Sequence, residues 1–332
     1  MSNPQRTESL ADGYVKWLRD QVGSQLIYLV YASGVIFDAQ GRILVQTRYD
    51  FDWLSVPGGA MELREALAET ARREVLEETG IEADINGFAG VLTHPQYNLQ
   101  YPNGDQVQQW TAIFWGEVAG GELRPDGGET LSARFMPPEE FLTSNIHPSH
   151  AAMVRAALRA RAGQPPELEA VETVPPIRPY YPILRARIPS EQAIILPGAM
   201  AIIEDEQGRI LMTHRSDFNY WELPAGLADL GETSTANIIR EVREETGLEV
   251  EPYALVGLYS DPRWHYFTYP SGDVTHGIAV VFACRVTGGT LVAEGADNEN
   301  DAIRFMSIEE RMEEAFPFEA TYQTLLDYQD RA

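Results

Sequence analysis

Cysteine is almost absent from this sequence. Its 332 residues include a single cysteine, Cys284, so no disulfide can form within the chain. Because secreted proteins of this size usually carry disulfides, we expect a reducing, cytoplasmic environment. Cys284 lies in an apolar run and is expected to be a buried strand residue rather than a reactive thiol.

Positive charge is also scarce, with 25 basic residues against 50 acidic ones and a formal net charge of −25. This excess disfavours binding to nucleic acid or to anionic membranes, because both would repel the chain. Phosphorylated substrates stay compatible if divalent cations bridge the two negative partners. The longest uncharged segment, residues 21–37, falls short of the ~20 apolar residues of a membrane helix and is more typical of strands. No signal peptide is expected, since the first residues include several charges.

The length suggests two domains at ~150 residues each, and the sequence repeats itself at an offset of 167 to 170 residues. The matching segments are Gly41–Leu44 with Gly208–Leu211, Tyr101–Asp105 with Tyr269–Asp273, Gly120–Gly121 with Gly288–Gly289, and Arg134–Met136 with Arg304–Met306. We therefore expect a duplicated domain, with copies at residues 1–162 and 180–332. Residues 163–179 contain five prolines and are expected to form an extended, semi-rigid linker.

Hydrophobic periodicity predicts similar elements in both copies. Strands are expected at residues 28–37, 43–47, 110–118, 199–204, 210–214 and 277–286, and helices at residues 63–79, 151–162 and 233–246. Strands mixed with helices predict an α+β fold in which each sheet is covered on both faces.

Each long helix ends in a cluster of carboxylates. Glu74, Glu77 and Glu78 share one helical face in the first copy, and Glu241, Glu244 and Glu245 repeat this arrangement. Like charges at this spacing repel, and the helix dipole disfavours negative charge at a C-terminus. A compensating cation is therefore expected, and Mg²⁺ commonly binds through a few carboxylates.

A tight loop with a glycine precedes each helix. Gly59 follows Val56–Gly58, and Gly226 follows Leu223–Ala225. A glycine allows the backbone to approach a ligand closely, so each carbonyl could complete a metal shell.

These residues resemble the signature of Nudix hydrolases, which is Gly-x5-Glu-x7-Arg-Glu-U-x-Glu-Glu-x-Gly-U with U aliphatic. The first box, residues 59–81, has Gly59, Glu65, Arg73, Glu74, Val75, Glu77, Glu78, Gly80 and Ile81 at the fixed positions. The second box, residues 226–248, has Gly226, Glu232, Arg240, Glu241, Val242, Glu244, Glu245, Gly247 and Leu248. The resemblance covers both repeats and implies two tandem Nudix folds, each an α/β/α sandwich around a mixed sheet.

The resemblance also implies chemistry: hydrolysis of the pyrophosphate bond of a nucleoside diphosphate derivative by water activated by Mg²⁺, with Mn²⁺ as an alternative ion. It assigns the metal shells to Gly59, Glu74, Glu77 and Glu78, and to Gly226, Glu241, Glu244 and Glu245. Glu77, Glu78, Glu244 and Glu245 are also expected in catalysis. Arg73 and Arg240 are expected to orient the clusters through Glu65 and Glu232, because they project ~100° from the first metal glutamate.

Related enzymes often take a general base from a later loop. Glu129 and Glu299 each stand six residues before a phenylalanine and are the candidates. Aromatic side chains could stack on a nucleobase, and arginines could contact substrate. The candidates are Trp53, Tyr97, Tyr101, Tyr220, Trp264, Tyr266, Tyr269, Arg48 and Arg215.

Substrate identity stays open at this stage. Glu222–Gly226 with Pro262, and Pro95 in the first copy, resemble the ADP-ribose-hydrolysing branch, whereas Val56–Gly59 resembles the branch that hydrolyses (deoxy)nucleoside triphosphates. Dinucleoside polyphosphates and nucleotide sugars are further alternatives. The two copies are expected to pack as an intramolecular pseudo-dimer. Two alternative functions are also open. One copy could be catalytic and the other regulatory, or the chain could be a nucleotide sensor without catalysis.

Overall fold

The computed structural model describes residues 13–170, 178–292 and 300–307, together with residues 310, 324, 325 and 328. The first copy contains α1 (Tyr14–Val22), β1 (Ile27–Phe37), β2 (Ile43–Arg48), β3 (Leu54–Ser55), β4 (Gly58–Ala60), α2 (Leu67–Thr79), β5 (Ile81–Leu92), the 3₁₀ turn η1 (Pro95–Tyr97), β6 (Leu99–Gln100), β7 (Gln106–Gly121), β8 (Thr130–Met136), α3 (Pro138–Phe141) and α4 (Pro148–Arg161). The second contains α5 (Tyr181–Arg185), β9 (Ile194–Ile203), β10 (Ile210–Arg215), β11 (Tyr220–Glu222), β12 (Ala225–Leu227), α6 (Ser234–Thr246), β13 (Leu248–Tyr259), α7 (Pro262–His265), β14 (Tyr266–Thr268), β15 (Val274–Gly289) and β16 (Asn300–Met306).

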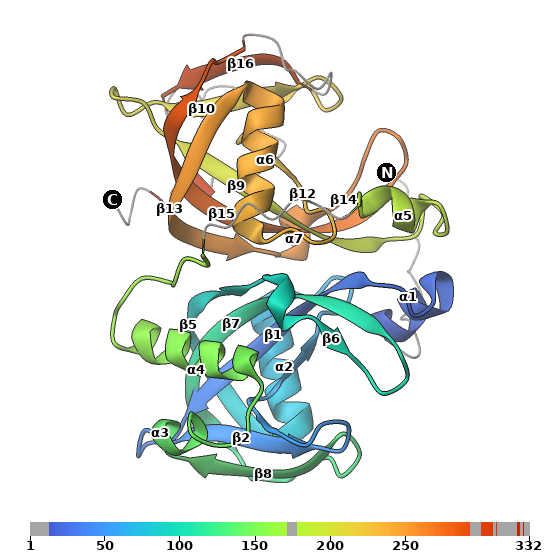
Figure 1. Ribbon diagram of the computed structural model, residues 1–332, viewed down its shortest axis with the longest axis vertical. Helices are drawn as coiled ribbons and strands as arrows, with labels where there is room; N and C mark the ends of the chain where they lie inside the picture. Colours follow the sequence, from blue (N-terminus) through green and yellow to red (C-terminus); the bar gives the residue numbers. More distant parts are fainter. Residues whose placement is uncertain are drawn as a thin grey trace.

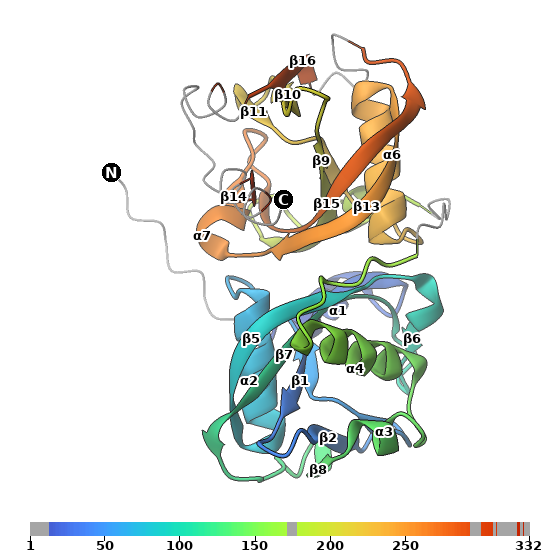
Figure 2. The same ribbon diagram turned by 90° about the vertical axis from the view of Figure 1, so that its left-hand side faces the viewer.

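Each copy is built on a mixed sheet. In the first copy the strand order is β3-β2-β1-β7-β5, with β1 and β7 parallel and β5 antiparallel to β7. In the second copy β9 and β15 form the matching parallel pair, and β13 lies antiparallel beside β15. Figure 2 shows α2 and α4 on opposite faces of the first sheet. The α+β class with a mixed sheet in each copy is confirmed.

Most predicted elements are present, with boundaries that tertiary contacts shift. The helix expected from residue 63 begins at Leu67, because Arg64 has a φ of 66° and Ala66 is extended at the N-cap. The strand expected at 110–118 extends over residues 106–121 because β5 and β6 pair with it. Cys284 is a buried strand residue as predicted, and burial raises the pKa of its thiol. No helix within the described ranges is both long and apolar enough to cross a membrane.

Four of the described helices were not predicted: α1, α5 and the short helices α3 and α7. Residues 21 and 22, expected in a strand, complete α1 instead. Arg19 donates to the carbonyls of Gly23, Gln25 and Gln106, and Arg185 makes the matching bonds in the second copy. The sequence repeats a pattern that belongs to α1 and α5: Tyr14, Leu18 and Arg19 return as Tyr180, Leu184 and Arg185. The repeated unit therefore begins near residue 14 and includes its first helix.

The two copies share one hydrophobic cluster. It contains Leu18, Tyr28 and Trp110 from the first copy and Leu184 and Phe282 from the second. Figure 1 shows the copies stacked along the long axis, with α5 above the junction and α1 below it, both at the right of the picture.

Three tyrosine hydroxyls bond across the junction, including that of Tyr28, which donates to the carbonyl of Asp229 at 2.6 Å. The hydroxyl of Tyr14 accepts from the N–H of Ile195 at 2.8 Å, and that of Tyr180 donates to the carbonyl of Tyr28 at 3.2 Å. The ring of Tyr180 also lies edge-on to that of Tyr28, with centroids 5.1 Å apart.

The described part of the linker is docked against the first copy. Glu167 bridges to Gly90 of β5. The Glu169 carboxylate accepts from the N–H groups of Thr93 and His94 at 2.7 and 2.9 Å, and burial raises its pKa. Residues 171–177 lie outside the described part of the chain.

Truncation of the shared cluster should test the coupling of the two copies. We expect Leu184→Ala to lower the free energy of unfolding by about 2–5 kcal/mol, because a fully buried leucine leaves a cavity. Leu131→Ala, at a side chain that is exposed, should change it by less than ~0.5 kcal/mol. Urea unfolding followed by tryptophan fluorescence measures both. An unchanged unfolding midpoint in Leu184→Ala would contradict this role for α5.

Candidate active site

In each copy the carboxylate cluster is held between a loop and the sheet. α2 and α6 end in left-handed glycines, Gly80 and Gly247, which let the chain turn directly into the next strand. The last glutamate of each cluster, Glu78 or Glu245, is only 4% exposed. Glu78 accepts from the N–H of Gly58 at 2.9 Å, and Glu245 from that of Ala225 at 3.1 Å. The loop before each helix is therefore tied to the end of that helix.

An arginine lies inside each cluster. Arg73 makes two bonds to the Glu65 carboxylate, at 2.8 and 2.9 Å, and reaches Glu74 at 2.6 Å and Glu77 at 3.1 Å. Arg240 repeats this arrangement with Glu232 at 2.7 and 2.9 Å, Glu241 at 2.7 Å and Glu244 at 3.0 Å. These are the ion pairs with Glu65 and Glu232 expected from the sequence. They join the loop to the cluster through one planar, bidentate group.

Burial shapes the charge of the clusters. It raises the pKa of the Glu74 and Glu241 carboxyls to about 7 each, against the opposing effect of the neighbouring arginine. It raises the pKa of Glu78 to about 8. Carboxylates in such a site lack solvation for their ionised form, and a bound cation would supply it.

The donor set fits a hard divalent cation. All the side-chain donors are carboxylate oxygens, which Mg²⁺ prefers. A methyl group at Gly59 or Gly226 would overlap the carboxylate of Glu74 or Glu241, so each glycine leaves a cradle for that carboxylate against the loop backbone. Within the described residues no three acidic, histidine or cysteine side chains converge as a ready-made shell. In the first box the Arg73 guanidinium stands between Glu74 and Glu77.

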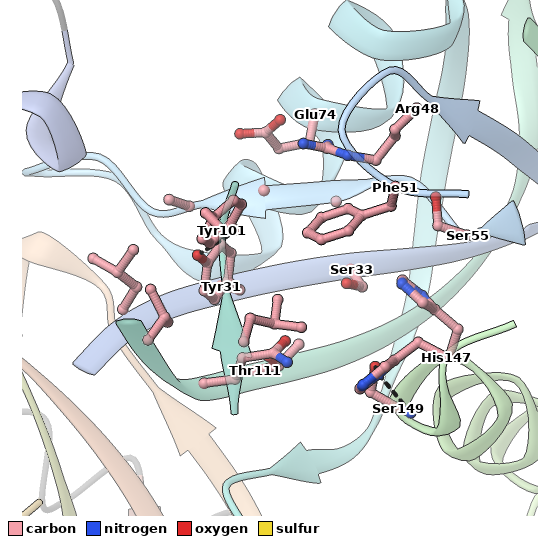
Figure 3. Close-up of a pocket in the computed structure, with 18 of the residues that line it drawn as sticks. Tyr31, Ser33, Arg48, Phe51, Ser55, Glu74, Tyr101, Thr111, His147 and Ser149 are labelled. Carbon is pink, nitrogen blue, oxygen red and sulfur yellow. Dashed lines mark hydrogen bonds between the residues drawn. The ribbon is translucent and has the colours of Figure 1, made fainter. Parts of the chain in front are cut away.

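A cavity opens beside each cluster. The first has a volume of about 410 Å³, and Figure 3 shows Glu74 and Arg48 at one side and Tyr31, Phe51 and Tyr101 around it. The second has a volume of about 680 Å³. Both are lined by side chains from the box, from the two parallel strands and from the loops at their ends.

Comparison with known proteins identifies the family. The NUDIX domain matches residues 28–157 and 195–327. The chain belongs to the Nudix family. It is a Nudix hydrolase, an enzyme of the class that acts on phosphorus-containing anhydrides.

Several individual proteins are similar to single domains of this Nudix hydrolase. A MutT-like protein of Streptomyces ambofaciens is 35% identical over 119 residues, which are 35% of this chain and 68% of that protein. A putative 8-oxo-dGTP diphosphatase of Bacillus subtilis is 33% identical over 100 residues, 30% of this chain and 60% of that protein. An ADP-ribose pyrophosphatase of Methanocaldococcus jannaschii is 33% identical over 116 residues, 33% of this chain and 64% of that protein. A solved ADP-ribose pyrophosphatase of Streptococcus suis is 24% identical, with a TM-score of 0.32, and covers 41% of this chain and 91% of its own.

The cavities bring most of the candidate residues together. The first is lined by Arg48, Trp53, Gly59, Glu74, Tyr101 and Glu129, and the second by Arg215, Tyr220, Gly226, Arg240, Glu241, Glu244, Glu245 and Tyr269. Tyr97, Trp264 and Tyr266 line neither cavity, and Arg73, Glu77 and Glu78 are not among the residues that line the first one. Tyr266 instead stacks under the Arg64 guanidinium at 4.0 Å. Glu299 lies outside the described residues.

Sequence reasoning missed part of the first cavity. Phe51 stacks on Trp53 with ring centroids 4.3 Å apart, and His147, Ser149 and His150 reach the cavity from the start of α4. The spacing of Phe51 and Trp53, two residues apart in the loop before β3, was an available signal. The approach of α4 was not, because its residues are distant in the sequence.

Arg48 and Glu129 meet at the edge of this cavity. Arg48 bonds to Glu78 at 3.0 Å and to Asp50 at 3.0 Å, and it also pairs with Glu129. Glu129 is half-exposed and follows a turn in which the Asp126 carboxylate accepts three backbone N–H groups. The loop is thus ordered up to Glu129, while the Glu129 carboxylate stays accessible to solvent.

Added bulk at the box glycines should displace the first glutamate of the cluster. With the second domain silenced by Glu244→Gln, we expect Gly59→Ala to lower turnover by about 10²-fold, the scale of a ~1 Å misplacement. The thermal unfolding midpoint should barely change, because the displaced atoms belong to the end of a flexible side chain. Steady-state kinetics measures the turnover, and a thermal melt measures the unfolding midpoint. Full turnover in Gly59→Ala would contradict the cradle.

Proposed function

We propose that each domain hydrolyses the pyrophosphate bond of a nucleoside diphosphate derivative by attack of water at phosphorus. The observation that carries the proposal is the duplicated set of desolvated box carboxylates, each beside a cavity that also presents aromatic rings. The carboxylates of Glu74, Glu77 and Glu78 with the Gly59 carbonyl, and their counterparts in the second box, would hold Mg²⁺. When bound, the ion neutralises the diphosphate charge and activates water.

The chain's own side chains then have separate tasks. Arg73 and Arg240 position the box through Glu65 and Glu232 and are not expected to touch substrate. Glu129 is the proposed general base of the first domain, because its carboxylate is accessible and lies at the cavity edge beside Arg48. Arg48 and Arg215 offer positive charge to the phosphates.

The two cavities support different substrates. In the first, Ser55 Oγ and His150 Nδ1 are buried without a partner among the described residues, so they can bond a base placed against Phe51 and Trp53. In the second, Glu222 replaces Ser55 and is already bonded to Tyr220 at 3.1 Å and Arg215 at 3.5 Å. We propose a (deoxy)nucleoside triphosphate for the first domain and an ADP-ribose-like substrate for the larger second cavity.

The chain is further proposed to act as an intramolecular pseudo-dimer. The cluster shared by the two halves and the crossed bonds of Tyr14 and Tyr180 support this arrangement. The domain limits near residues 162 and 180 stay a proposal of the same kind.

Removal of one box carboxylate in each domain tests the function. Glu77→Gln and Glu244→Gln should each remove the turnover of one domain, and the double variant nearly all of it, because the missing charge weakens the metal shell. Formation of the nucleoside monophosphate from a panel of nucleoside diphosphate derivatives, with Mg²⁺ and with EDTA, measures this. Glu82→Gln, an exposed carboxylate just beyond helix α2, is the matched control. Full activity in the double variant or in EDTA would refute the proposal.

Replacement of the proposed base should affect rate without affecting the metal. In the Glu244→Gln background we expect Glu129→Gln to lower kcat by ~10²–10⁴-fold, the usual contribution of a general base. The Mg²⁺ concentration for half-activity should stay constant, since the box is intact. A loss below about threefold would mean that Glu129 is not the base. A large rise in the Mg²⁺ requirement would make it a metal ligand instead.

A further inference from the structure

The start of each box helix is bonded to the other domain. Helix α2 has Ala66 at its N-cap, which offers no side-chain oxygen to the free N–H groups of the first turn. The N–H of Leu67 donates instead to Ser260 Oγ of the second domain at 2.9 Å. The N–H of Arg64 points the same way and donates to His276 Nδ1 at 3.3 Å.

The start of the second box helix is bonded in the same way to the first domain. The N–H of Ser234 donates to Thr93 Oγ1 of the first domain at 2.8 Å, and the N–H of Gly231 donates to Gln108 Oε1 at 2.8 Å. Gln108 Nε2 donates in turn to the Glu232 carbonyl at 2.9 Å. The donors stand at an offset of 167 residues from their counterparts, and Arg64 and Gly231 share a positive φ of 66° and 99°. The contact is therefore reciprocal and part of the duplicated architecture.

The side chains that make these contacts are buried and face away from their own cavities. Gln108, Thr93 and His276 are 0% exposed. Successive strand residues point to opposite sides, so Val107 and Gln109 line the first cavity while Gln108 faces the second domain. Thr275 and Gly277 line the second cavity, and His276 faces the first domain. These side chains thus contribute nothing to the cavity of the domain that carries them.

His276 acts as a neutral imidazole. Its Nε2 lies 3.0 Å from the Ser260 carbonyl, so Nε2 carries the proton and Nδ1 is free to accept from Arg64. Burial lowers the pKa of His276 to about 4, consistent with a neutral ring. The same side chain therefore fixes Arg64 and the backbone of Ser260 together.

The bonded loops connect directly to the box carboxylates. Glu65 lies between Arg64 and Leu67, the two residues held by the second domain, and it binds Arg73, which reaches Glu74. In the second box Glu232 lies between Gly231 and Ser234 and binds Arg240, which reaches Glu241. In each box, two side chains therefore connect the loop held by the opposite domain to the first glutamate of the cluster.

We infer that each domain positions the box of the other: Gln108 and Thr93 are positioning residues for the second active site, and His276 and Ser260 for the first. This inference rests on the proposed function for its consequence in catalysis. It goes further in that each active site is incomplete in an isolated domain. A substitution in one domain should therefore impair the active site of the other.

The test separates the domains by silencing one box at a time. In the Glu77→Gln background, where only the second domain acts, Gln108→Leu should lower kcat by about tenfold or more and leave KM within threefold, since the cavity is untouched. In the Glu244→Gln background, where only the first domain acts, the same substitution should change kcat by less than twofold. His276→Leu should give the opposite pattern. His276→Gln, which provides the acceptor that Gln108 provides in the first domain, should restore most of the loss.

Hydrogen exchange gives a readout that is independent of turnover. Gln108→Leu should speed amide exchange at residues 228–236 and leave residues 61–69 unchanged, and His276→Leu should do the reverse. Loss of turnover in the domain that carries the substitution, or unchanged exchange at the opposite box, would overturn the inference. If the parent variants hydrolyse no substrate, the proposed function fails, and exchange alone still decides whether the domains hold one another's boxes.

Discussion

The structure depends on the stabilisation of several carboxylates that lie close together at the end of one helix. Like charges repel there, the helix dipole opposes them, and burial removes the water that would solvate them. The guanidinium groups of Arg73 and Arg240 offset part of this repulsion, because each binds the loop glutamate and the cluster together. The remaining negative charge accounts for a site suited to a divalent cation, and it contributes to the acidity of the chain as a whole.

Duplication turned this local arrangement into a single molecule with two related sites. The core does not divide at the linker, since one hydrophobic cluster includes residues of both copies. The linker itself takes part, because Thr93 is held by the buried Glu169 while its hydroxyl accepts from Ser234. Because the domains share a core and the linker contacts both, the geometry of each active site depends on how the other domain packs against it.

The two copies have kept the box and changed the cavity. Every fixed position of the signature is present twice, and the ion pairs of the two boxes match within a few tenths of an ångström. Ser55 of the first cavity is replaced by Glu222, and Tyr31 by Gly198, which agrees with the different cavity volumes. Chemistry and selectivity are therefore carried by separate parts of the fold.

The sequence by itself determined the repeat, the box helices, the glycines beside them and the pairing of Arg73 with Glu65, because these follow from local spacing and from charge. It also located several side chains of the cavities, such as Arg48, Glu129 and Tyr269, because the repeat places them at matching positions near the box. Only the tertiary structure decided that α4 brings His150 to the first cavity, that Trp264 stays out of the second, and that Gln108 faces the other domain. Those outcomes depend on contacts between residues distant in the chain, and no local pattern encodes the direction in which a buried side chain points.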